Sequence, residues 1–182
     1  MRFSTWFFRT CIILIVPLTG CAQTSPQVHA DANIQVQDRA FDRKLTHMLE
    51  FDVPLIAVDS LYQDRTSFIL LDIRTAEEYQ TSHIPDAQLI HVGSNDLRVV
   101  EHLSRNQPIV VYCSVGYRSE KFGKILIDGG FTSVFNLYGS IFEWVNAGYP
   151  VVDSRNRMTN KVHTYSRRWA KYITNPDIQK TW

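Results

Sequence analysis

The chain has 182 residues, enough for one domain with short additions at its ends. Its composition, 45% hydrophobic and 12% aromatic, excludes a chain that is disordered throughout. The formal net charge of +1 excludes a protein that is strongly basic or acidic overall. The charges are distributed unevenly along the chain. Residues 151–182 carry seven Lys and Arg against two Asp, a net charge of +5. Residues 22–150 carry ten basic and sixteen acidic side chains, a net charge of −6. A basic tail therefore follows an acidic body.

The N-terminus has the pattern of a targeting segment, which is left out of the fold. Arginines flank a short aromatic cluster, and the apolar run from Cys11 to Leu18 is shorter than the roughly 20 residues that span a membrane. The run ends in Leu18-Thr19-Gly20-Cys21, which resembles the lipobox of bacterial lipoproteins. This resemblance implies that residues 1–20 are a signal peptide and that Cys21 becomes the lipidated first residue.

A lipid on Cys21 implies a periplasmic protein that is anchored to a membrane. Ala22, in place of Asp, resembles the sorting pattern of outer-membrane lipoproteins. The alternative is ordinary cleavage near Ala22, with Cys21 removed or left free. Because Cys11 leaves with the signal peptide and Cys21 carries lipid, Cys113 is expected to be the one thiol of the mature chain, and no internal disulfide is possible.

The predicted elements begin after a polar tether at residues 21–34. Phe41, Leu45, Met48 and Leu49 recur at helical spacing and predict an N-terminal helix over residues 35–50 that packs on the core. Strands and helices then alternate. Strands are predicted at 55–58, 68–72, 88–90, 109–112 and 133–136, and helices at 59–62, 75–79, 96–104, 119–128 and 140–146.

This alternation predicts an α/β domain over residues 51–153, built on a parallel sheet with helices on both faces. Two helix starts carry capping signals. Asp59 is expected to cap the first short helix, and Thr75 with Glu78 forms the pattern of a capping box. The chemistry of such sheets lies beyond the carboxyl ends of the strands, where Cys113 falls.

Cys113 ends an apolar strand and precedes a short glycine-containing loop, after which a helix is predicted to begin at Ser119. The backbone N–H groups at a helix start have no partners within the helix and point at whatever the sulfur carries. The same positive end lowers the pKa of a thiol, and the thiolate is the reactive form. The sequence therefore predicts an activated cysteine.

Three segments resemble motifs of the rhodanese-like domain family, and the match covers roughly residues 51–152. The segments are Leu71–Tyr79 with His83–Ala87, Cys113–Ser119, and Asn136–Ser140 with Trp144, Ala147-Gly148 and Pro150-Val151. The resemblance implies a rhodanese-like fold and a sulfurtransferase that holds sulfane sulfur as a persulfide on Cys113. It implies a small donor such as thiosulfate, an acceptor such as cyanide or a thiol, and no cofactor.

The same resemblance implies that the loop after Cys113 binds the substrate sulfur. A persulfide anion is stabilised by backbone N–H groups and a helix terminus, so little side-chain chemistry is needed. Arg118 either attracts anionic donors or points to solvent. Tyr117 is bulky enough to narrow the pocket or to stack on an organic acceptor. The candidate substrate-binding residues are Ser114, Val115, Gly116, Tyr117, Arg118 and Ser119.

Two other functions stay open. Phosphatases and arsenate reductases of similar fold have five residues between cysteine and arginine, whereas this chain has four, Ser114 to Tyr117. A smaller loop suits one sulfur atom better than a tetrahedral phosphate. The third possibility is a non-catalytic rhodanese module for binding or sensing.

The sequence departs from the family pattern at three turns. Glycines are frequent in the family at the positions of Ser82, Asp86 and Ser140, and we interpret these three residues as tolerated turn substitutions.

The remaining polar residues near the strand ends have structural interpretations. Arg74 is expected to pair with Glu78, Asp72 to bind neighbouring backbone, and His83 to fix a turn. The other histidines lack metal-ligand spacing, so no metal is expected.

In the tail, residues 154–182, the spacing of aromatic residues such as Tyr165 and Trp169 predicts an amphipathic helix. This helix packs on the domain or meets anionic lipid, and no nucleic-acid partner is expected.

Overall fold

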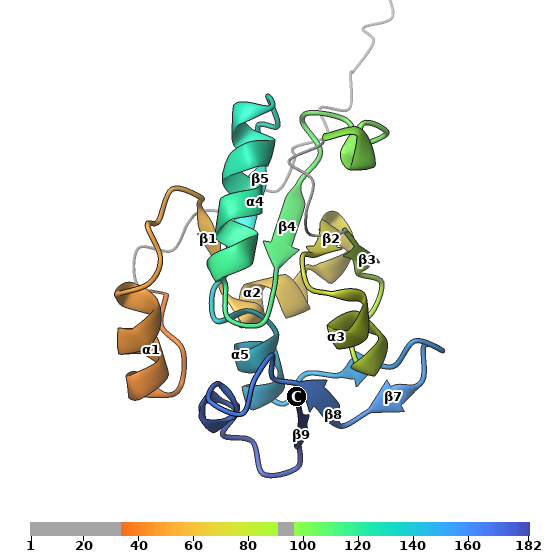
Figure 1. Cartoon of the computed structure of the whole chain (residues 1–182). Helices are drawn as coiled ribbons and strands as arrows, with labels where there is room; N and C mark the ends of the chain where they lie inside the picture. The colour runs from red at the N-terminus through yellow and green to blue at the C-terminus, as the bar shows by residue number, and fades with distance from the viewer. Residues whose placement is uncertain (1–33, 91–96) are drawn as a thin grey trace, which may run out of the picture.

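The computed structural model describes residues 34–90 and 97–182 (Figure 1). The predicted signal peptide, the lipidation site Cys21 and nearly all of the predicted tether lie outside the described residues.

A parallel sheet forms the centre of the molecule, and within the described residues it has five strands in the order β1-β5-β4-β2-β3. The strands are β1 (Leu55–Ile56), β2 (Ile69–Asp72), β3 (Gln88–Leu89), β4 (Ile109–Tyr112) and β5 (Val134–Leu137). The central strand β4 lies between β2 and β5, with Val110 opposite Leu70 and Phe135. All four residues of β4 are buried, which explains why this strand reads as a continuous apolar run.

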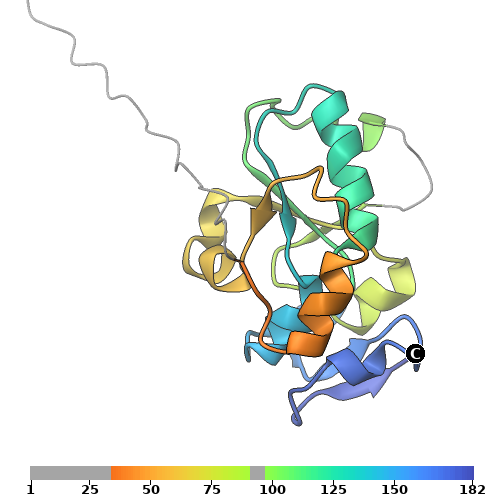
Figure 2. The ribbon, with the colours of Figure 1, turned by 90° about the vertical axis from the view of Figure 1, so that its left-hand side faces the viewer.

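Helices cover both faces of the sheet (Figures 1 and 2). They are α1 (Arg39–Thr46), α2 (Val58–Gln63), α3 (Ala76–Thr81), α4 (Tyr117–Asp128) and α5 (Ser140–Asn146), with 3-10 turns η1 (Arg65–Ser67), η2 (Leu97–Val100) and η3 (Ala170–Tyr172). Successive residues of β4 point to opposite faces, so Val111 belongs to the same core cluster as Phe122 of α4, and Val110 belongs to the other cluster, with Phe142 of α5. The predicted α/β fold is confirmed. None of the helices in residues 34–90 and 97–182 has the length and apolar character needed to cross a membrane.

Local signals predicted some helix starts and missed others. Thr75 and Glu78 form the predicted capping box at the start of α3. The predicted Asp59 cap is wrong, because α2 begins at Val58 after Ala57 and has no side-chain cap. Of the helix predicted over 96–104, the described residues 97–104 form only the 3-10 turn Leu97–Val100.

Two helices differ in length from the sequence prediction. The N-terminal helix α1 covers only Arg39–Thr46, because the Asp38 side chain accepts a hydrogen bond from the Phe41 N–H and so fixes its start. The helix after Cys113 begins at Tyr117 and not at Ser119, because Gly116 leaves the loop with a φ of 113°. Tyr117 and Arg118 therefore belong to the first turn of α4.

The C-terminal segment, residues 154–182, is not the predicted amphipathic helix. It forms β7 (Met158–Thr159), which pairs with β6 (Val151–Val152), and β8 (Lys161–His163), which pairs in parallel with β9 (Gln179–Thr181). Pairing with β9 holds β8 extended, and Tyr165 takes a φ of 62° that no helix contains.

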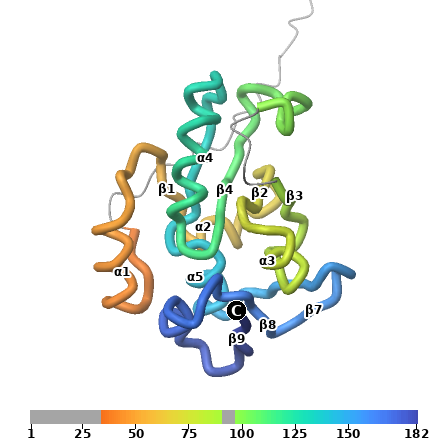
Figure 3. The backbone as a smooth tube through the Cα atoms, viewed as in Figure 1, coloured from red at the N-terminus to blue at the C-terminus, as the bar shows by residue number. Residues whose placement is uncertain are grey.

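This segment packs on the domain, as one of the two sequence interpretations expected. Val162 and Ile173 are buried in the core beside α1 and α5. The side chain of Asn146, at the end of α5, accepts from the Thr174 N–H at 2.8 Å and donates to the Tyr172 carbonyl at 2.9 Å. The backbone tube shows the segment running across the end of the molecule below α5 (Figure 3).

The burial of Val162 predicts that the C-terminal segment contributes to stability. Val162→Ala should lower the free energy of unfolding by about 2 kcal/mol, because it removes buried methyl groups and leaves a cavity. The matched control is Met158→Ala in the same segment, where the side chain is 70% exposed and the expected change is under about 0.5 kcal/mol. Urea unfolding followed by circular dichroism measures both, and equal midpoints for the two variants would contradict the packing.

Candidate active site

Cys113 lies directly after β4, at the carboxyl edge of the sheet, and its side chain is 1% exposed. The chain then turns through Ser114, Val115 and Gly116 into α4. The positive φ of Gly116 is a conformation that residues with a Cβ rarely adopt. This turn aims the Gly116 N–H back at the Cys113 Sγ, 3.2 Å away. The thiol is therefore the acceptor of a main-chain hydrogen bond inside its own loop.

Side chains from β5 and α5 hold this loop in place. Asn136 on β5 donates from Nδ2 to the Gly116 carbonyl at 3.0 Å and accepts from the Ser119 hydroxyl at 2.7 Å. The Cys113 N–H donates to the Ser140 Oγ at 3.2 Å. Ser140 has a φ of 52°, in the left-handed region that favours glycine, so this turn keeps a glycine-like backbone while adding a hydroxyl to the loop's support.

A buried carboxylate from α3 joins the other side of the loop. The guanidinium of Arg118 binds Glu78 through two hydrogen bonds, of 2.8 and 2.7 Å. The Ser114 hydroxyl donates to Glu78 at 2.8 Å and accepts from Arg118 at 2.9 Å. The predicted pair of Arg74 with Glu78 is therefore wrong, and neither of the two roles expected for Arg118, attracting an anion or pointing to solvent, included this pairing.

Arg74 instead binds the neighbouring Asp72, at 2.7 Å between Nη2 and Oδ2, with both side chains fully buried. Asp72 also accepts from the Arg74 backbone N–H at 3.0 Å, which is the backbone role expected for it. His83 lies 3.0 Å from the Tyr79 carbonyl through Nδ1 and exchanges backbone hydrogen bonds with Val152, so it fixes its turn as expected.

The charge state of Glu78 follows from its partners. Burial alone raises the pKa of this carboxyl, but Arg118, the Thr75 N–H and the Ser114 hydroxyl together lower the pKa to about 2. Because the folded pKa lies below the ordinary value of 4.5, this carboxylate stabilises the fold fully above about pH 4.5. The contribution is lost as the pH falls towards 2.

The same environment favours the thiolate of Cys113. Burial raises the pKa of the thiol, yet the charge of Arg118 and the N–H groups of Ser119, Gly116 and Val115 outweigh burial, so the pKa lies below its ordinary value. A thiolate is the nucleophilic form of cysteine. The loop can therefore present a sulfur nucleophile without a neighbouring general base.

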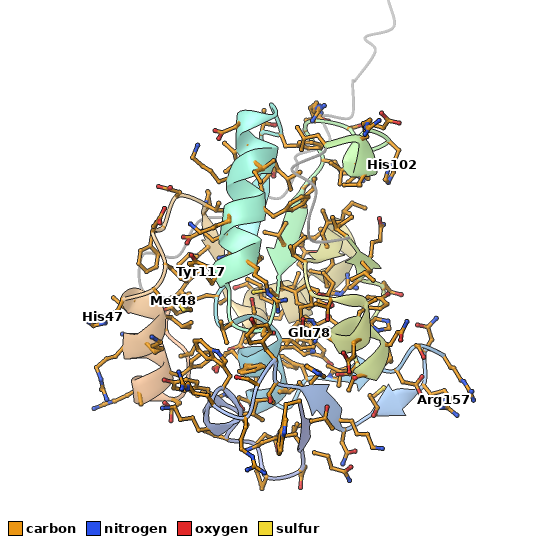
Figure 4. All side chains as sticks on the ribbon, viewed as in Figure 1. His47, Met48, Glu78, His102, Tyr117 and Arg157 are labelled. Atoms are coloured by element: carbon orange, nitrogen blue, oxygen red, sulfur yellow. The ribbon has the colours of Figure 1, made fainter. Side chains whose placement is uncertain are left out.

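A pocket of about 230 Å³ opens over the sulfur. Residues from three parts of the chain line it: Met48, which follows α1; Cys113, Ser114, Val115, Tyr117 and Arg118 from the loop and α4; and Tyr165 and Trp169 from the C-terminal segment. Figure 4 shows Met48 and Tyr117 side by side at the base of α4, with Glu78 on the opposite side of the loop. A small molecule in this pocket would reach Cys113.

The candidate residues taken from the sequence divide into two groups. Five of them line the pocket: Cys113, Ser114, Val115, Tyr117 and Arg118. Gly116 and Ser119 do not line the pocket; their N–H groups act on the Cys113 sulfur, and both residues are held by hydrogen bonds with Asn136.

Five residues of the site could not be assigned to it from the sequence alone. For Glu78 the sequence predicts a capping role and a pair with Arg74, and not the pairing with Arg118 beside the active-site loop, although an acidic side chain near a strand end is a usable signal. Asn136 was included only as part of a motif, and Met48, Tyr165 and Trp169 were assigned to helix faces. Nothing in their local sequence indicates that chain segments on both sides of the domain meet at Cys113.

Comparison with known proteins identifies the family of the domain. The family model described as Rhodanese-like domain matches residues 57–147. The chain is 34% identical over 89 residues to a sulfurtransferase of Allochromatium vinosum, covering 49% of this chain and 82% of that protein. It is 31% identical over 83 residues to the thiosulfate sulfurtransferase GlpE of Pseudomonas savastanoi, covering 45% and 76%.

Solved structures agree in fold. The solution structure of the rhodanese-like domain of an Anabaena protein superposes with a TM-score of 0.51 at 23% identity, covering 55% of this chain and 79% of that one. The matched family region includes Cys113, Glu78 and Arg118 but ends before Tyr165 and Trp169.

The charges around Cys113 predict opposite effects for two substitutions. Arg118→Met removes the cation and leaves Glu78 unpaired, so the pH midpoint of thiol alkylation should rise by about one unit or more. Glu78→Gln leaves Arg118 uncompensated, so the midpoint should fall. Rates of iodoacetamide modification against pH measure both, with free cysteine as the reference that should titrate above the wild-type protein. Shifts of the same sign in the two variants would contradict this electrostatic account.

Proposed function

This chain belongs to the rhodanese-like domain family, and from that premise we propose that it is a sulfurtransferase that carries sulfane sulfur as a persulfide on Cys113. The observation that carries the proposal is the position of the Cys113 Sγ, under a pocket and 3.2 Å from the Gly116 N–H. The relatives from Allochromatium vinosum and Pseudomonas savastanoi, which have sulfurtransferase names, support the same reaction class.

The proposed reaction has two steps with one covalent intermediate. The Cys113 thiolate attacks the outer sulfur of a donor such as thiosulfate, the sulfur–sulfur bond of the donor breaks, and sulfite leaves with the electron pair of that bond. A nucleophilic acceptor, a thiolate or cyanide, then attacks the outer sulfur of the persulfide and releases the Cys113 thiolate. The sulfur atom is transferred without a net oxidant, so no cofactor is required.

The loop's chemistry fits this intermediate. A persulfide carries negative charge on its outer sulfur, and the N–H groups of Val115, Gly116 and Ser119 already act on the thiolate. In a site shielded from water, fixed N–H dipoles stabilise an anion without reorganising during the reaction. The role proposed for Arg118 is to hold the thiolate form of Cys113, with Glu78 fixing the position of its guanidinium.

Phosphate and arsenate chemistry is less well supported. Four residues separate Cys113 from Arg118, and the guanidinium is already occupied by two hydrogen bonds to Glu78. A tetrahedral dianion would have to compete with that carboxylate for the same donors. A non-catalytic binding module is the other candidate, and the lowered pKa of the Cys113 thiol favours catalysis over it.

We further propose that the mature protein is anchored to a periplasmic membrane surface through lipid on Cys21, which the lipobox-like Leu18-Thr19-Gly20-Cys21 supports. Wild-type protein expressed in a Gram-negative host with labelled palmitate should carry the label and fractionate with membranes. Cys21→Ser should lose both properties, whereas Cys113→Ser, the matched control, should keep them. Equal labelling of wild-type and Cys21→Ser protein would contradict the anchor.

The persulfide intermediate has a direct test. After exposure to thiosulfate, the peptide that contains Cys113 should gain the mass of one sulfur atom, and dithiothreitol should remove it. Cys113→Ser should lower thiosulfate:cyanide transfer by more than about a thousandfold, because a serine hydroxyl stays protonated at neutral pH. Mass spectrometry and the thiocyanate assay check the two outcomes. Wild-type activity in the serine variant would contradict the mechanism, and turnover of aryl phosphates without sulfur gain would favour a phosphatase.

A further inference from the structure

Three of the eight residues that line the pocket over Cys113 lie outside the family domain. Met48 precedes the matched region of residues 57–147, and Tyr165 and Trp169 follow it. We call these three residues the apolar rim. Figures 1 and 2 both show the C-terminal segment, in blue, below the sheet with α1, in orange, next to it. The rim therefore brings both flanks of the chain to the mouth of the site.

The rim residues are held in place by specific contacts. Trp169 packs against the main core and lies 5.6 Å from the Tyr172 ring between centroids. The Tyr165 ring lies 5.3 Å from the Arg118 guanidinium, and the Tyr165 N–H donates to the His163 Nδ1 at 3.1 Å. The backbone of Tyr165 has a φ of 62°, a conformation that costs energy for a residue with a Cβ. This strained turn places an aromatic ring at the pocket.

The rim changes which substrates the pocket favours. Arg118 is the cation that lines the pocket, and its charge is already paired with Glu78 while its guanidinium lies over the Tyr165 ring. A dianion such as thiosulfate would lose water on entering a space walled by Met48 and Trp169 and would gain no unpaired positive charge from the lining side chains. Apolar groups gain from the same burial. The lining therefore favours an apolar substrate body over an inorganic dianion.

Resting on the sulfur transfer proposed above, we infer that the substrate class is small organic sulfane-sulfur compounds whose apolar or aromatic group is bound by Met48, Tyr165 and Trp169. The cavity of about 230 Å³ has room for such a group, since an apolar cavity of about 150 Å³ holds benzene. With an organic persulfide, the Cys113 thiolate attacks the outer sulfur of R–S–SH, giving Cys113–S–SH and R–S⁻. The S–S bond of the donor breaks, its electron pair leaves with R–S⁻, and the proton stays on the transferred sulfur.

A matched series of three donors tests this selectivity on the full chain. Thiosulfate, methanethiosulfonate and benzenethiosulfonate each present a terminal sulfur and differ in the group on the sulfonyl end. For each donor, kcat/KM is divided by the rate of the same donor with free cysteine, which removes intrinsic reactivity. The wild-type ratio for benzenethiosulfonate should exceed that for thiosulfate by at least about tenfold, with methanethiosulfonate between them.

Variants locate the selectivity at the rim. Tyr165→Asn removes the ring while keeping a residue that tolerates positive φ, and Trp169→Ala opens the other wall. Each should lower the ratio of kcat/KM for benzenethiosulfonate to kcat/KM for thiosulfate by about fivefold or more. Trp182→Ala is the matched control, because Trp182 lies in the same segment, is 57% exposed and does not line the pocket. It should change neither donor.

The outcomes separate this inference from the proposed function. If all three donors load sulfur on Cys113 with equal normalised kcat/KM, or the rim variants lower every donor equally while remaining folded, the selectivity is overturned and the sulfurtransferase stands. If no donor adds sulfur to Cys113, the proposed function itself fails. Circular dichroism spectra matching the wild type show that a variant is folded, and Tyr165→Asn provides the test if Trp169→Ala does not fold.

Discussion

The hydrogen bond from the Gly116 N–H to the Cys113 Sγ depends on a loop that is held from three sides. Asn136 on β5 binds the Gly116 carbonyl, Ser140 at the start of α5 accepts from the Cys113 N–H, and Glu78 on α3 binds the side chains that follow the sulfur. A free loop would turn its N–H groups to water. Because β5, α5 and α3 hold it, the loop directs them at a buried sulfur atom.

Burial and charge act against each other at this sulfur. A thiol with 1% exposure would normally stay protonated, since burial disfavours the charged form. Arg118 and the loop N–H groups reverse that preference, and Glu78 limits how much positive charge remains for a substrate. The site therefore suits a single anionic sulfur better than a multiply charged ligand. The apolar rim likewise favours a substrate whose remaining part, beyond the transferred sulfur, is apolar.

Elements with local signals could be predicted from the sequence, and long-range partners could not. The strand before Cys113 and the Thr75–Glu78 capping box depend on neighbouring residues, and both were predicted. The pairing of Glu78 with Arg118 joins residues far apart in the chain, and no periodicity indicates it. The C-terminal segment was predicted as a helix from aromatic spacing, but pairing of β8 with β9 holds that region extended. The rim of the pocket was missed for the same reason.

The central claim, that the loop N–H groups hold an anionic sulfur on Cys113, is tested most directly by a high-resolution crystal structure of the sulfur-loaded protein. The outer sulfur of the persulfide should lie within hydrogen-bond distance, below about 3.6 Å, of at least two backbone nitrogens between Val115 and Ser119. An outer sulfur that points into the pocket, away from those nitrogens, would contradict the account.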